Sequence, residues 1–397
     1  MNENIQDLLI IGGGVMGLMT AYAAAPLSSN ITIIEKSRIG DPQTASFGYT
    51  RSIRNDYLDP FYARLAYQAR QLWLELERKA PEPFIINCGC LNIAKANVTP
   101  NLAGTYAEQS YRVLADLHLK TEAFTRETLG QRFPQFDVDM ARLDVEAGFI
   151  YVPYVTRTLQ AALQAHHVNI LEETEIIAIE QQHNSIYVTT SAGQILARKL
   201  IITAGLGTND VLARITGCHI QYPLQPDRPS QCKYYMPPPE KLPMFTSNAL
   251  PVFAYLDVGI YGHPILNGRT PGVKIGFYNP PDATLAHTHI HDIAAFVEEC
   301  MPALHDAPTI DVTEVDQCFY DLVADDNFII GPLPGFPHIT IGVGWRGTGY
   351  KYAPWIGHTL MQLALQQGTV YDITRFSPGR FTAKDQGGGK PGPYPAT

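Results

Sequence analysis

The residues of this chain whose chemistry is easiest to name are three glycines near its N-terminus. Gly12, Gly14 and Gly17 have the spacing G-x-G-x-x-G. In such a motif the first glycine permits a tight turn, the second lets backbone approach a pyrophosphate, and the third lets a helix pack closely on a strand. The helix that follows would offer unpaired N–H groups and a positive dipole end to a phosphate. The spacing therefore predicts a dinucleotide-phosphate site that includes Val15 and Met16.

The elements around the motif support this interpretation. Residues 7–11 are an apolar run typical of a buried parallel strand, and residues 18–25 suit a helix. A second apolar strand at residues 31–34 ends at Glu35, about where the dinucleotide-binding fold places its acidic residue. The Glu35 carboxylate could accept hydrogen bonds from both hydroxyls of an adenosine ribose. The alternative is a glycine turn in an ordinary βαβ unit, and four elements in register argue against it.

Four other polar residues have simple structural explanations when they are considered singly. Arg51 and Arg54 lie three residues apart after a glycine and could be surface arginines. Lys274 lies between two apolar residues and could be an exposed strand lysine. Cys318 precedes two aromatic residues, which is typical of a buried core thiol. Residue type alone therefore assigns no chemistry to these positions.

Length and composition indicate a soluble protein of two or three domains. The chain has 397 residues, of which 45% are hydrophobic and 17% charged. A net charge of −9 argues against nucleic acid and anionic membrane surfaces as partners. No apolar run approaches the length of a membrane span, and the N-terminus enters a strand without a signal peptide. Six cysteines do not suggest a disulfide framework. We therefore expect a cytoplasmic protein.

Periodicity predicts alternating helices and strands along the chain. Helices are expected over residues 61–80, 106–119, 156–165, 292–301 and 355–367, and residues 84–95 are expected to form a strand or hairpin. Residues 221–282 are rich in proline, glycine and aromatics, which suits an antiparallel sheet with many turns. The tail from residue 387 is rich in glycine and proline, which is typical of disorder.

Several separated motifs occur in an order and spacing that are far more specific than any one of them. They lie at residues 12–17, 48–54, 71–77, 272–276, 318–330 and 347–351. Together they resemble the monomeric sarcosine oxidase group of the D-amino-acid-oxidase-like flavoproteins, which includes N-methyltryptophan, pipecolate and fructosyl amino acid oxidases. The resemblance extends from Asp7 to about Phe376. It implies FAD, rather than NAD, as the cofactor.

The resemblance also implies an α/β fold with two interleaved domains. A Rossmann-like FAD-binding domain is expected from residues 1–80, 150–215 and 315–383. An α+β substrate domain built on an antiparallel sheet is expected from residues 81–149 and 216–314, followed by a flexible tail at 384–397.

For the cofactor, the resemblance implies a covalent thioether between Cys318 and the flavin ring. Such a bond raises the reduction potential of the flavin and prevents its loss, while the protein supplies position and electrostatics. The full set of predicted cofactor-binding residues is Gly12, Gly14, Val15, Met16, Gly17, Glu35, Lys36, Thr50, Arg51, Ile176, Ala204, Gly205, Cys318, Gly347, Thr348, Gly349 and Lys351.

For catalysis, the resemblance assigns roles to several cations. Arg51 matches a residue over the flavin ring, and Arg54 with Lys351 matches a pair that grips the substrate carboxylate, as suits a guanidinium fork and an ammonium. Lys274 matches a lysine that assists dioxygen, because a fixed cation stabilises developing superoxide. The predicted catalytic residues are Lys274, Arg51, Tyr261 and Lys351, and the predicted substrate-binding residues are Arg54, Lys351, Tyr261, Tyr278 and Trp345.

The chain departs from this group at several positions of the predicted pocket. Phe47 and Tyr278 stand where sarcosine-oxidising relatives carry histidines, and Trp345 stands where phenylalanine is usual, whereas Tyr261 is retained. The pocket is therefore expected to be more aromatic and less basic, which favours a larger, cyclic or aromatic amino acid over sarcosine itself. Arg346 is an added charge that could be a third anion contact or a solvated loop residue.

The sequence thus predicts an enzyme, an FAD-dependent amine oxidase acting on a carboxylate-bearing secondary or cyclic amine. Its products would be an imine and hydrogen peroxide. Its partners would be the small-molecule substrate and dioxygen, with no metal, nucleic acid or membrane, and it would be a monomer. One alternative is a dehydrogenase that passes electrons to a protein or quinone. Another is a non-catalytic flavin-binding protein, against which the presence of Arg54, Lys274 and Lys351 argues.

Overall fold

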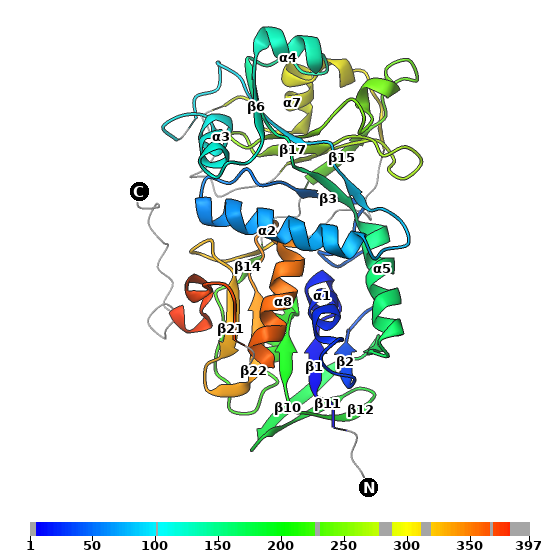
Figure 1. Ribbon diagram of the computed structural model, residues 1–397, viewed down its shortest axis with the longest axis vertical. Helices are drawn as coiled ribbons and strands as arrows, with labels where there is room; N and C mark the ends of the chain where they lie inside the picture. Colours follow the sequence, from blue (N-terminus) through cyan, green and yellow to red (C-terminus); the bar gives the residue numbers. More distant parts are fainter. Residues whose placement is uncertain are drawn as a thin grey trace. The chain divides into compact units, whose positions relative to one another are not determined.

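The computed structural model describes residues 5–100, 102–226, 231–277, 288–310, 319–365 and 368–381. The chain forms two compact units (Figure 1). Unit 1 contains Met1–Phe47, Val155–Arg228 and Phe319–Thr397, and unit 2 contains Gly48–Tyr154 and Pro229–Cys318. Each unit is thus assembled from stretches of chain that alternate along the sequence.

The first boundary between the units lies at residue 47, whereas the sequence placed it at residue 80. Strand β3 (Thr50–Ile53) pairs with β8 (Gly148–Tyr151), which also belongs to unit 2. Helix α2 (Pro60–Glu77) follows β3 and buries Trp73 edge-on against Phe84 in the same unit. Residues 48–80 therefore pack with unit 2, because their partners in strand pairing and in the core lie there.

Unit 1 is built on a six-stranded sheet in the order β21-β22-β13-β1-β2-β9. The strands are β1 (Leu8–Ile11), β2 (Ile31–Ile34), β9 (Asn169–Leu171), β13 (Leu200–Ile202), β21 (Ile329–Leu333) and β22 (Phe336–Val343). All neighbouring pairs are parallel except the β21–β22 hairpin. The central strands are almost wholly apolar, as expected for a parallel sheet that is covered on both faces. This sheet confirms the Rossmann-like prediction.

Helices α1 (Val15–Ala24) and α8 (Ala353–Ala364) lie side by side against the six-stranded sheet (Figure 1). Helix α5 (Val152–Ala165) contains the point in the chain, between Tyr154 and Val155, where unit 2 ends and unit 1 resumes. Helix α6 (Thr208–Leu212) follows β13. Unit 1 also contains two small antiparallel sheets: β10 (Ile176–Gln182), β11 (Ser185–Thr190) and β12 (Gly193–Ala197) form one, and β14 (Gln225–Pro226) with β20 (Asp321–Leu322) forms the other.

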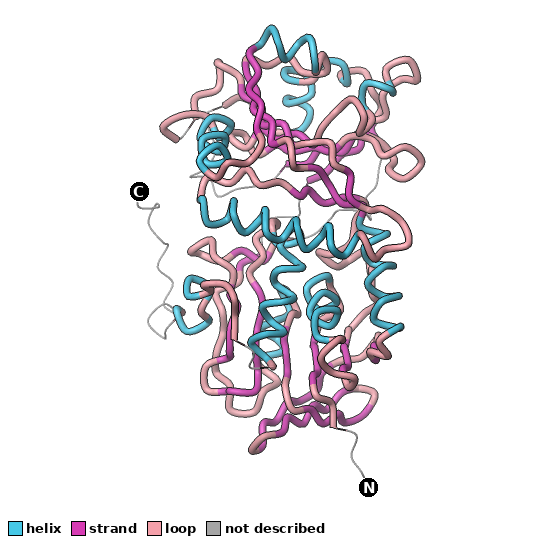
Figure 2. The backbone as a smooth tube through the Cα atoms, viewed as in Figure 1, coloured by secondary structure: helices cyan, strands magenta, loops and turns pink. Residues whose placement is uncertain are grey.

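Unit 2 is built on an eight-stranded sheet in the order β19-β15-β18-β17-β16-β5-β7-β6. Figure 2 draws the described strands of the chain in magenta. The strands of this sheet are β5 (Cys90–Ala94), β6 (Thr121–Thr125), β7 (Met140–Asp144), β15 (Gln231–Tyr235), β16 (Val252–Tyr255), β17 (Ile260–His263), β18 (Val273–Phe277) and β19 (Thr309–Ile310). Neighbours are antiparallel except β5 and β16, which come from the two different stretches of the unit and run parallel. The sheet is therefore mixed at that one pair.

The rest of unit 2 surrounds this sheet. Strands β3, β8 and β4 (Ile85–Ile86) form a second, three-stranded sheet, so β4 and β5 belong to different sheets and residues 84–95 form no hairpin. Helices α3 (Tyr106–Asp116), α4 (Arg126–Arg132) and α7 (Ile293–Cys300) complete the unit. In the core, Phe253 stacks on Phe296 with a centroid separation of 6.1 Å. Burial of such aromatic rings supplies much of the hydrophobic stabilisation.

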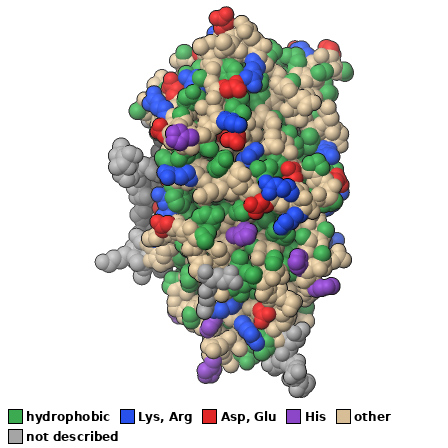
Figure 3. Space-filling view, viewed as in Figure 1, with side chains coloured by type: hydrophobic (Ala, Val, Ile, Leu, Met, Phe, Trp, Pro, Cys, Tyr) green, Lys and Arg blue, Asp and Glu red, His purple; other side chains and the backbone are tan. Residues whose placement is uncertain are grey.

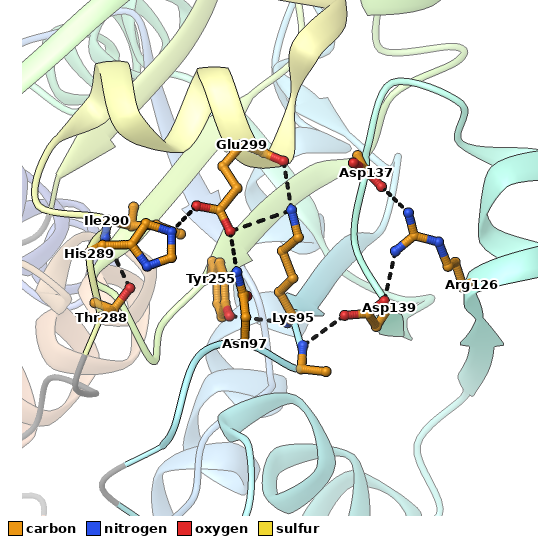
Figure 4. A network of polar contacts seen from close by, with 11 residues as sticks. Lys95, Asn97, Arg126, Asp137, Asp139, Tyr255, Thr288, His289, Ile290 and Glu299 are labelled. Carbon is orange, nitrogen blue, oxygen red and sulfur yellow. Dashed lines mark hydrogen bonds and ion pairs between the residues drawn. The ribbon is translucent and has the colours of Figure 1, made fainter.

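A polar network joins several of these elements at the edge of unit 2 (Figure 4). The Oε1 atom of Glu299 on α7 accepts a hydrogen bond of 2.7 Å from Asn97 and lies 3.4 Å from Lys95 Nζ. Arg126 at the start of α4 pairs with Asp139 at 2.7 Å. None of these residues belongs to the predicted site, and the network links β5, β7, α4 and α7.

Charged side chains of both signs are interspersed on the face of the molecule in Figure 3. Such a mixture, with a net charge of −9, gives this face no single-sign patch that would attract a polyanion. Among the described residues, no helix is both long and apolar enough to cross a membrane.

Candidate functional site

The glycine motif forms the turn between β1 and α1 in unit 1. Gly12 has a φ of +107°, and a Cβ atom there would lie 2.5 Å from the Thr203 carbonyl oxygen. A Cβ atom on Gly17 would lie 1.8 Å from the Gly12 carbonyl oxygen. Both positions therefore require glycine, because the turn, α1 and the end of β13 approach one another at backbone distance.

Glu35 fixes the shape of this turn. Its buried Oε2 accepts a hydrogen bond of 2.7 Å from the Gly13 N–H, and its Oε1 accepts bonds from the Ser37 N–H at 2.9 Å and hydroxyl at 3.0 Å. Each carboxylate oxygen has two lone pairs, so Glu35 retains one acceptor position, on Oε2, for a ribose hydroxyl. Helix α1, all of whose residues are described, has no acidic residue in its first turn. These features fit the adenosine and pyrophosphate parts of FAD.

The predicted cofactor residues of unit 1 gather along one edge of the six-stranded sheet. The glycine turn follows β1, Glu35 and the exposed Lys36 follow β2, Ala204 and Gly205 follow β13, and residues 347–349 come shortly after β22. In a parallel sheet these carboxyl ends lie at the same edge, where open α/β sheets bind their ligands. Ile176 lies at the start of β10, in the separate three-stranded sheet.

Lys351 and Trp345 lie in the segment between β22 and α8. Lys351 belongs to a short 3₁₀ helix, Gly349–Tyr352, and only 7% of its surface is exposed. Its Nζ donates to the Thr348 carbonyl at 3.1 Å and lies 5.7 Å from the centre of the Tyr352 ring. Trp345 packs edge-on against Phe328 at 5.5 Å. The lysine is therefore a buried cation beside the edge of the sheet that carries the glycine turn.

Arg346 forms an ion pair with Asp326. Its Nη2 lies 2.6 Å from the Asp326 carboxylate, its Nη1 donates to the carbonyl of the same residue at 2.6 Å, and 21% of its side chain is exposed. The φ of Arg346 is +56° and that of Asp326 is +57°. The ion pair therefore joins two residues whose backbone has a positive φ. It also shows that Arg346 is not a solvated loop residue, which was one of the two possibilities considered from the sequence.

Lys274 and Tyr261 lie together in unit 2, on the neighbouring strands β18 and β17. Only 3% of Lys274 is exposed, which excludes the exposed strand lysine considered from the sequence. Its Nζ lies 5.9 Å from the centre of the Tyr261 ring, within cation–π distance. The Tyr261 ring crosses over Gly276, where a Cβ atom would lie 2.3 Å from Tyr261 Cζ. A buried ammonium is costly, and such groups are commonly functional.

Arg51 and Thr50 lie on β3 of unit 2. Arg51 is half-buried, and its Nη1 donates to the Thr50 carbonyl at 2.9 Å. The Thr50 side chain is buried and its hydroxyl contacts His263, a residue that sequence reasoning did not select.

Arg54 has a carboxylate partner within its own unit. Its Nη1 lies 2.8 Å from Asp56 Oδ1, and the two side chains are 12% and 0% exposed. Burial is the largest single effect on Arg54 and opposes its positive charge. Asp56, together with Tyr106, Tyr57 and Cys90, outweighs burial and raises the pKa of Arg54 well above its ordinary value. The guanidinium also lies 5.0 Å from the centre of the Tyr57 ring. The partner of Arg54 is thus an aspartate only two residues further along the chain. The Arg-x-Asp spacing was a signal in the sequence that could have indicated this ion pair.

A second buried carboxylate lies behind this pair. Asp56 also accepts a hydrogen bond from the side chain of Asn92, and Asp144 accepts one of 2.7 Å from the Asn55 N–H. Burial, reinforced by the negative charge of Asp56, raises the pKa of Asp144 to about 7. The Asp144 carboxyl is therefore partly protonated near neutrality.

The structure distributes the predicted residues over both units. Lys351 and Trp345 belong to unit 1, and Arg54, Lys274 and Tyr261 belong to unit 2. The convergence of Arg54 and Lys351 on one carboxylate remains a prediction. Cys318 and Tyr278 lie outside the described residues.

Comparison with known proteins places this chain among flavin enzymes over nearly its whole length. It is 28% identical over 400 residues to the peroxisomal sarcosine oxidase of Homo sapiens, covering 96% of this chain and 97% of the relative. It is 26% identical to the monomeric sarcosine oxidase of Arthrobacter sp. (strain TE1826) over 96% and 97% of the two chains. The crystal structure of L-proline dehydrogenase from P. horikoshii has a similar fold, with a TM-score of 0.77 and 19% identity over 95% and 98% of the chains.

A family model described as FAD dependent oxidoreductase matches residues 7–363, which include the glycine turn, Lys274 and Lys351. The match confirms the resemblance drawn from the sequence motifs and the prediction of an FAD-dependent enzyme. The chain belongs to the FAD-dependent oxidoreductase family.

Proposed function

We propose that this enzyme oxidises a carboxylate-bearing secondary or cyclic amine, an N-substituted or cyclic amino acid, to an imine and releases hydrogen peroxide. The observation that carries the proposal is the burial of three cations with assigned roles. Lys274, Lys351 and the Arg54 side chain are only 3%, 7% and 12% exposed. Buried cations cost stability, so their presence at these positions favours function over structure. Sarcosine, named for two of the relatives, is itself a secondary amine with a carboxylate.

In this proposal the chain's own residues bind and orient the substrate. When bound, FAD would accept two electrons from the amine and donate them to dioxygen. Arg54 and Lys351 bind the carboxylate and so hold the amine-bearing carbon in place, which lowers the entropic part of the barrier. Lys274 keeps a fixed positive charge where dioxygen gains negative charge. The aromatic side chains of Tyr261 and Trp345 favour a larger, cyclic or aromatic amino acid as the substrate.

The test is a panel of amines assayed under air with hydrogen peroxide as the readout. We expect secondary and cyclic amino acids to give peroxide, and the amide or ester of the true substrate to be poor. Equal kcat/KM for the acid and its amide would replace this proposal with a plain amine oxidase. Reduction of an artificial acceptor dye without peroxide would indicate a dehydrogenase, and no turnover of any amine would favour a non-catalytic flavin protein.

We further propose that the flavin is attached covalently through Cys318, on the basis of the motif around this residue. Acid-precipitated protein should then stay yellow, because a thioether survives denaturation. Cys318→Ser should release its flavin into the supernatant on the same treatment, and Cys232→Ser is the control, since Cys232 lies on β15 near Tyr261. Free flavin in the supernatant of the unaltered protein would refute the covalent link. The monomeric state and the cytoplasmic location also stay predictions.

A further inference from the structure

His263, the last residue of β17, is a buried histidine to which the proposed function gives no role. It is 1% exposed. Its Nδ1 lies 2.5 Å from the Thr50 hydroxyl, and its Nε2 lies 2.7 Å from the Ser52 hydroxyl. The ring stacks on Phe149 of β8, with a centroid separation of 5.6 Å and an interplanar angle of 14°. Both ring nitrogens and one face of the ring therefore contact the three-stranded sheet.

The position of His263 relates it to two residues of the predicted site. Side chains alternate along a strand, so Thr50 and Ser52 point to one side of β3 and Arg51 points to the other. In the antiparallel pair of β17 and β18, His263 lies directly opposite Lys274. Opposite residues share a face of the sheet, with Cβ atoms about 4.5–5.5 Å apart. His263, the immediate cross-strand neighbour of Lys274, thus also contacts the strand that carries Arg51.

The chemistry of the ring suits this connection. A neutral imidazole donates from one nitrogen and accepts at the other, and a hydroxyl can do either. The two hydroxyls therefore satisfy both nitrogens, one as acceptor and one as donor. Apolar residues would hold two sheets together equally well, but they tolerate sliding and repacking. Two directed hydrogen bonds to alternate residues of β3 specify which part of that strand faces β17.

We propose that His263 is a positioning residue for the reaction with dioxygen. As a neutral imidazole that bridges Thr50 and Ser52, it keeps β3, with Arg51, at a defined place relative to Lys274. The role of Lys274 rests on the proposed function and that of Arg51 on the family resemblance, whereas the bridge rests on the contacts described above.

Four variants of the holoenzyme test this role. His263→Phe keeps a ring that can stack on Phe149 but removes both nitrogens, and Ser52→Ala removes one hydroxyl. His263→Gln keeps a donor and an acceptor. Thr359→Val is the control, because it removes a fully buried hydroxyl on α8, which donates to the Trp355 carbonyl at 2.9 Å, away from the predicted site. Stopped-flow measurements follow anaerobic flavin reduction by substrate and reoxidation by dioxygen separately.

We expect His263→Phe to slow reoxidation by roughly tenfold or more, since small displacements of catalytic groups have effects of this size. Anaerobic reduction should change by no more than about threefold, because the substrate contacts assigned to Arg54 and Lys351 are not touched. Ser52→Ala should show a smaller loss in the same step, His263→Gln should recover part of the rate, and Thr359→Val should leave both rates unchanged. If His263→Phe fails to fold, Ser52→Ala carries the test.

Nitrogen NMR of histidine-labelled protein provides a readout that does not depend on activity. The signals that His263→Gln removes should show one protonated and one unprotonated nitrogen, and Ser52→Ala should shift them. An imidazolium pattern, or no response to Ser52→Ala, would overturn the bridge. Normal reoxidation in His263→Phe alongside slow reoxidation in Lys274→Met would overturn the positioning role alone. Normal reoxidation in Lys274→Met would instead refute the role of Lys274 in the proposed function.

Discussion

Lys274→Met is expected to slow the reoxidation of the reduced enzyme by dioxygen by about 100-fold or more, the usual effect of removing a fixed electrostatic contact. Lys274 is buried on β18 beside the Tyr261 ring, which fixes the position of its ammonium group. Water screens electrostatic interactions of such a buried group less than those of an exposed one. Methionine is unbranched and of similar length, and it should fill the same space. Anaerobic reduction by substrate should remain near the unaltered rate, because Lys274 is assigned no contact with the carboxylate.

The matched control is Lys95→Met. Lys95 is also a largely buried cation of unit 2, 14% exposed and paired with Glu299 in the network of Figure 4, but it is not a predicted site residue. Its loss should lower stability and leave reoxidation unchanged. Stopped-flow mixing of reduced enzyme with dioxygen measures the rate, and an unaltered rate in Lys274→Met would remove this lysine from the reaction with dioxygen.

Arg54→Met and Lys351→Met are each expected to lower kcat/KM for the amino acid substrate by about 10- to 150-fold. Each removes one charge-assisted hydrogen bond, typically worth roughly 1.5–3 kcal/mol. Small carboxylates should inhibit the unaltered enzyme competitively and inhibit both variants less. The losses should be much smaller for the amide of the same substrate, because it lacks the charge that these residues bind.

The ion pair with Asp56 makes the Arg54 experiment more demanding. Arg54→Met alone leaves the Asp56 carboxylate buried without its cation, which is strongly destabilising. The double variant Arg54→Met/Asp56→Asn removes both charges and should recover stability, as measured by thermal unfolding, without recovering kcat/KM. Recovery of kcat/KM in the double variant would show that Arg54 serves only to neutralise Asp56. Equal losses for the acid and its amide would likewise contradict carboxylate recognition.

The amino-acid sequence by itself determined the glycine turn and the core of the six-stranded sheet. The roles of Gly12 and Gly17 could be predicted because a side chain at either position would clash with neighbouring backbone atoms. The glycine itself therefore indicates the local geometry. The strands β1 and β2 could be predicted because burial on both faces makes them continuous apolar runs. The family could be recognised because its motifs keep their order along the chain.

The ends of the helices and strands and the boundaries of the units were harder to predict from the sequence. Helix α8 begins and ends two and three residues before its predicted bounds, at Ala353 and Ala364. The family resemblance assigned residues 48–80 to the FAD-binding domain, whereas the structure places them in unit 2. They pack in unit 2 because β3 pairs with β8, about 100 residues further along the chain. The periodicity of a segment indicates that it forms a strand, but it does not indicate which distant strand it pairs with.

Only the tertiary structure decided how the polar residues of the site are held. Arg54, Asn55 and Asp56 are consecutive in the sequence, but their burial and the raised pKa of Asp144 depend on strands β5 and β7. Thr50 and His263 are 213 positions apart, and no spacing rule connects them. Periodicity reports which face of an element is apolar. It does not report which polar groups from distant segments meet, because that depends on how the sheets pack and on the partners that burial requires.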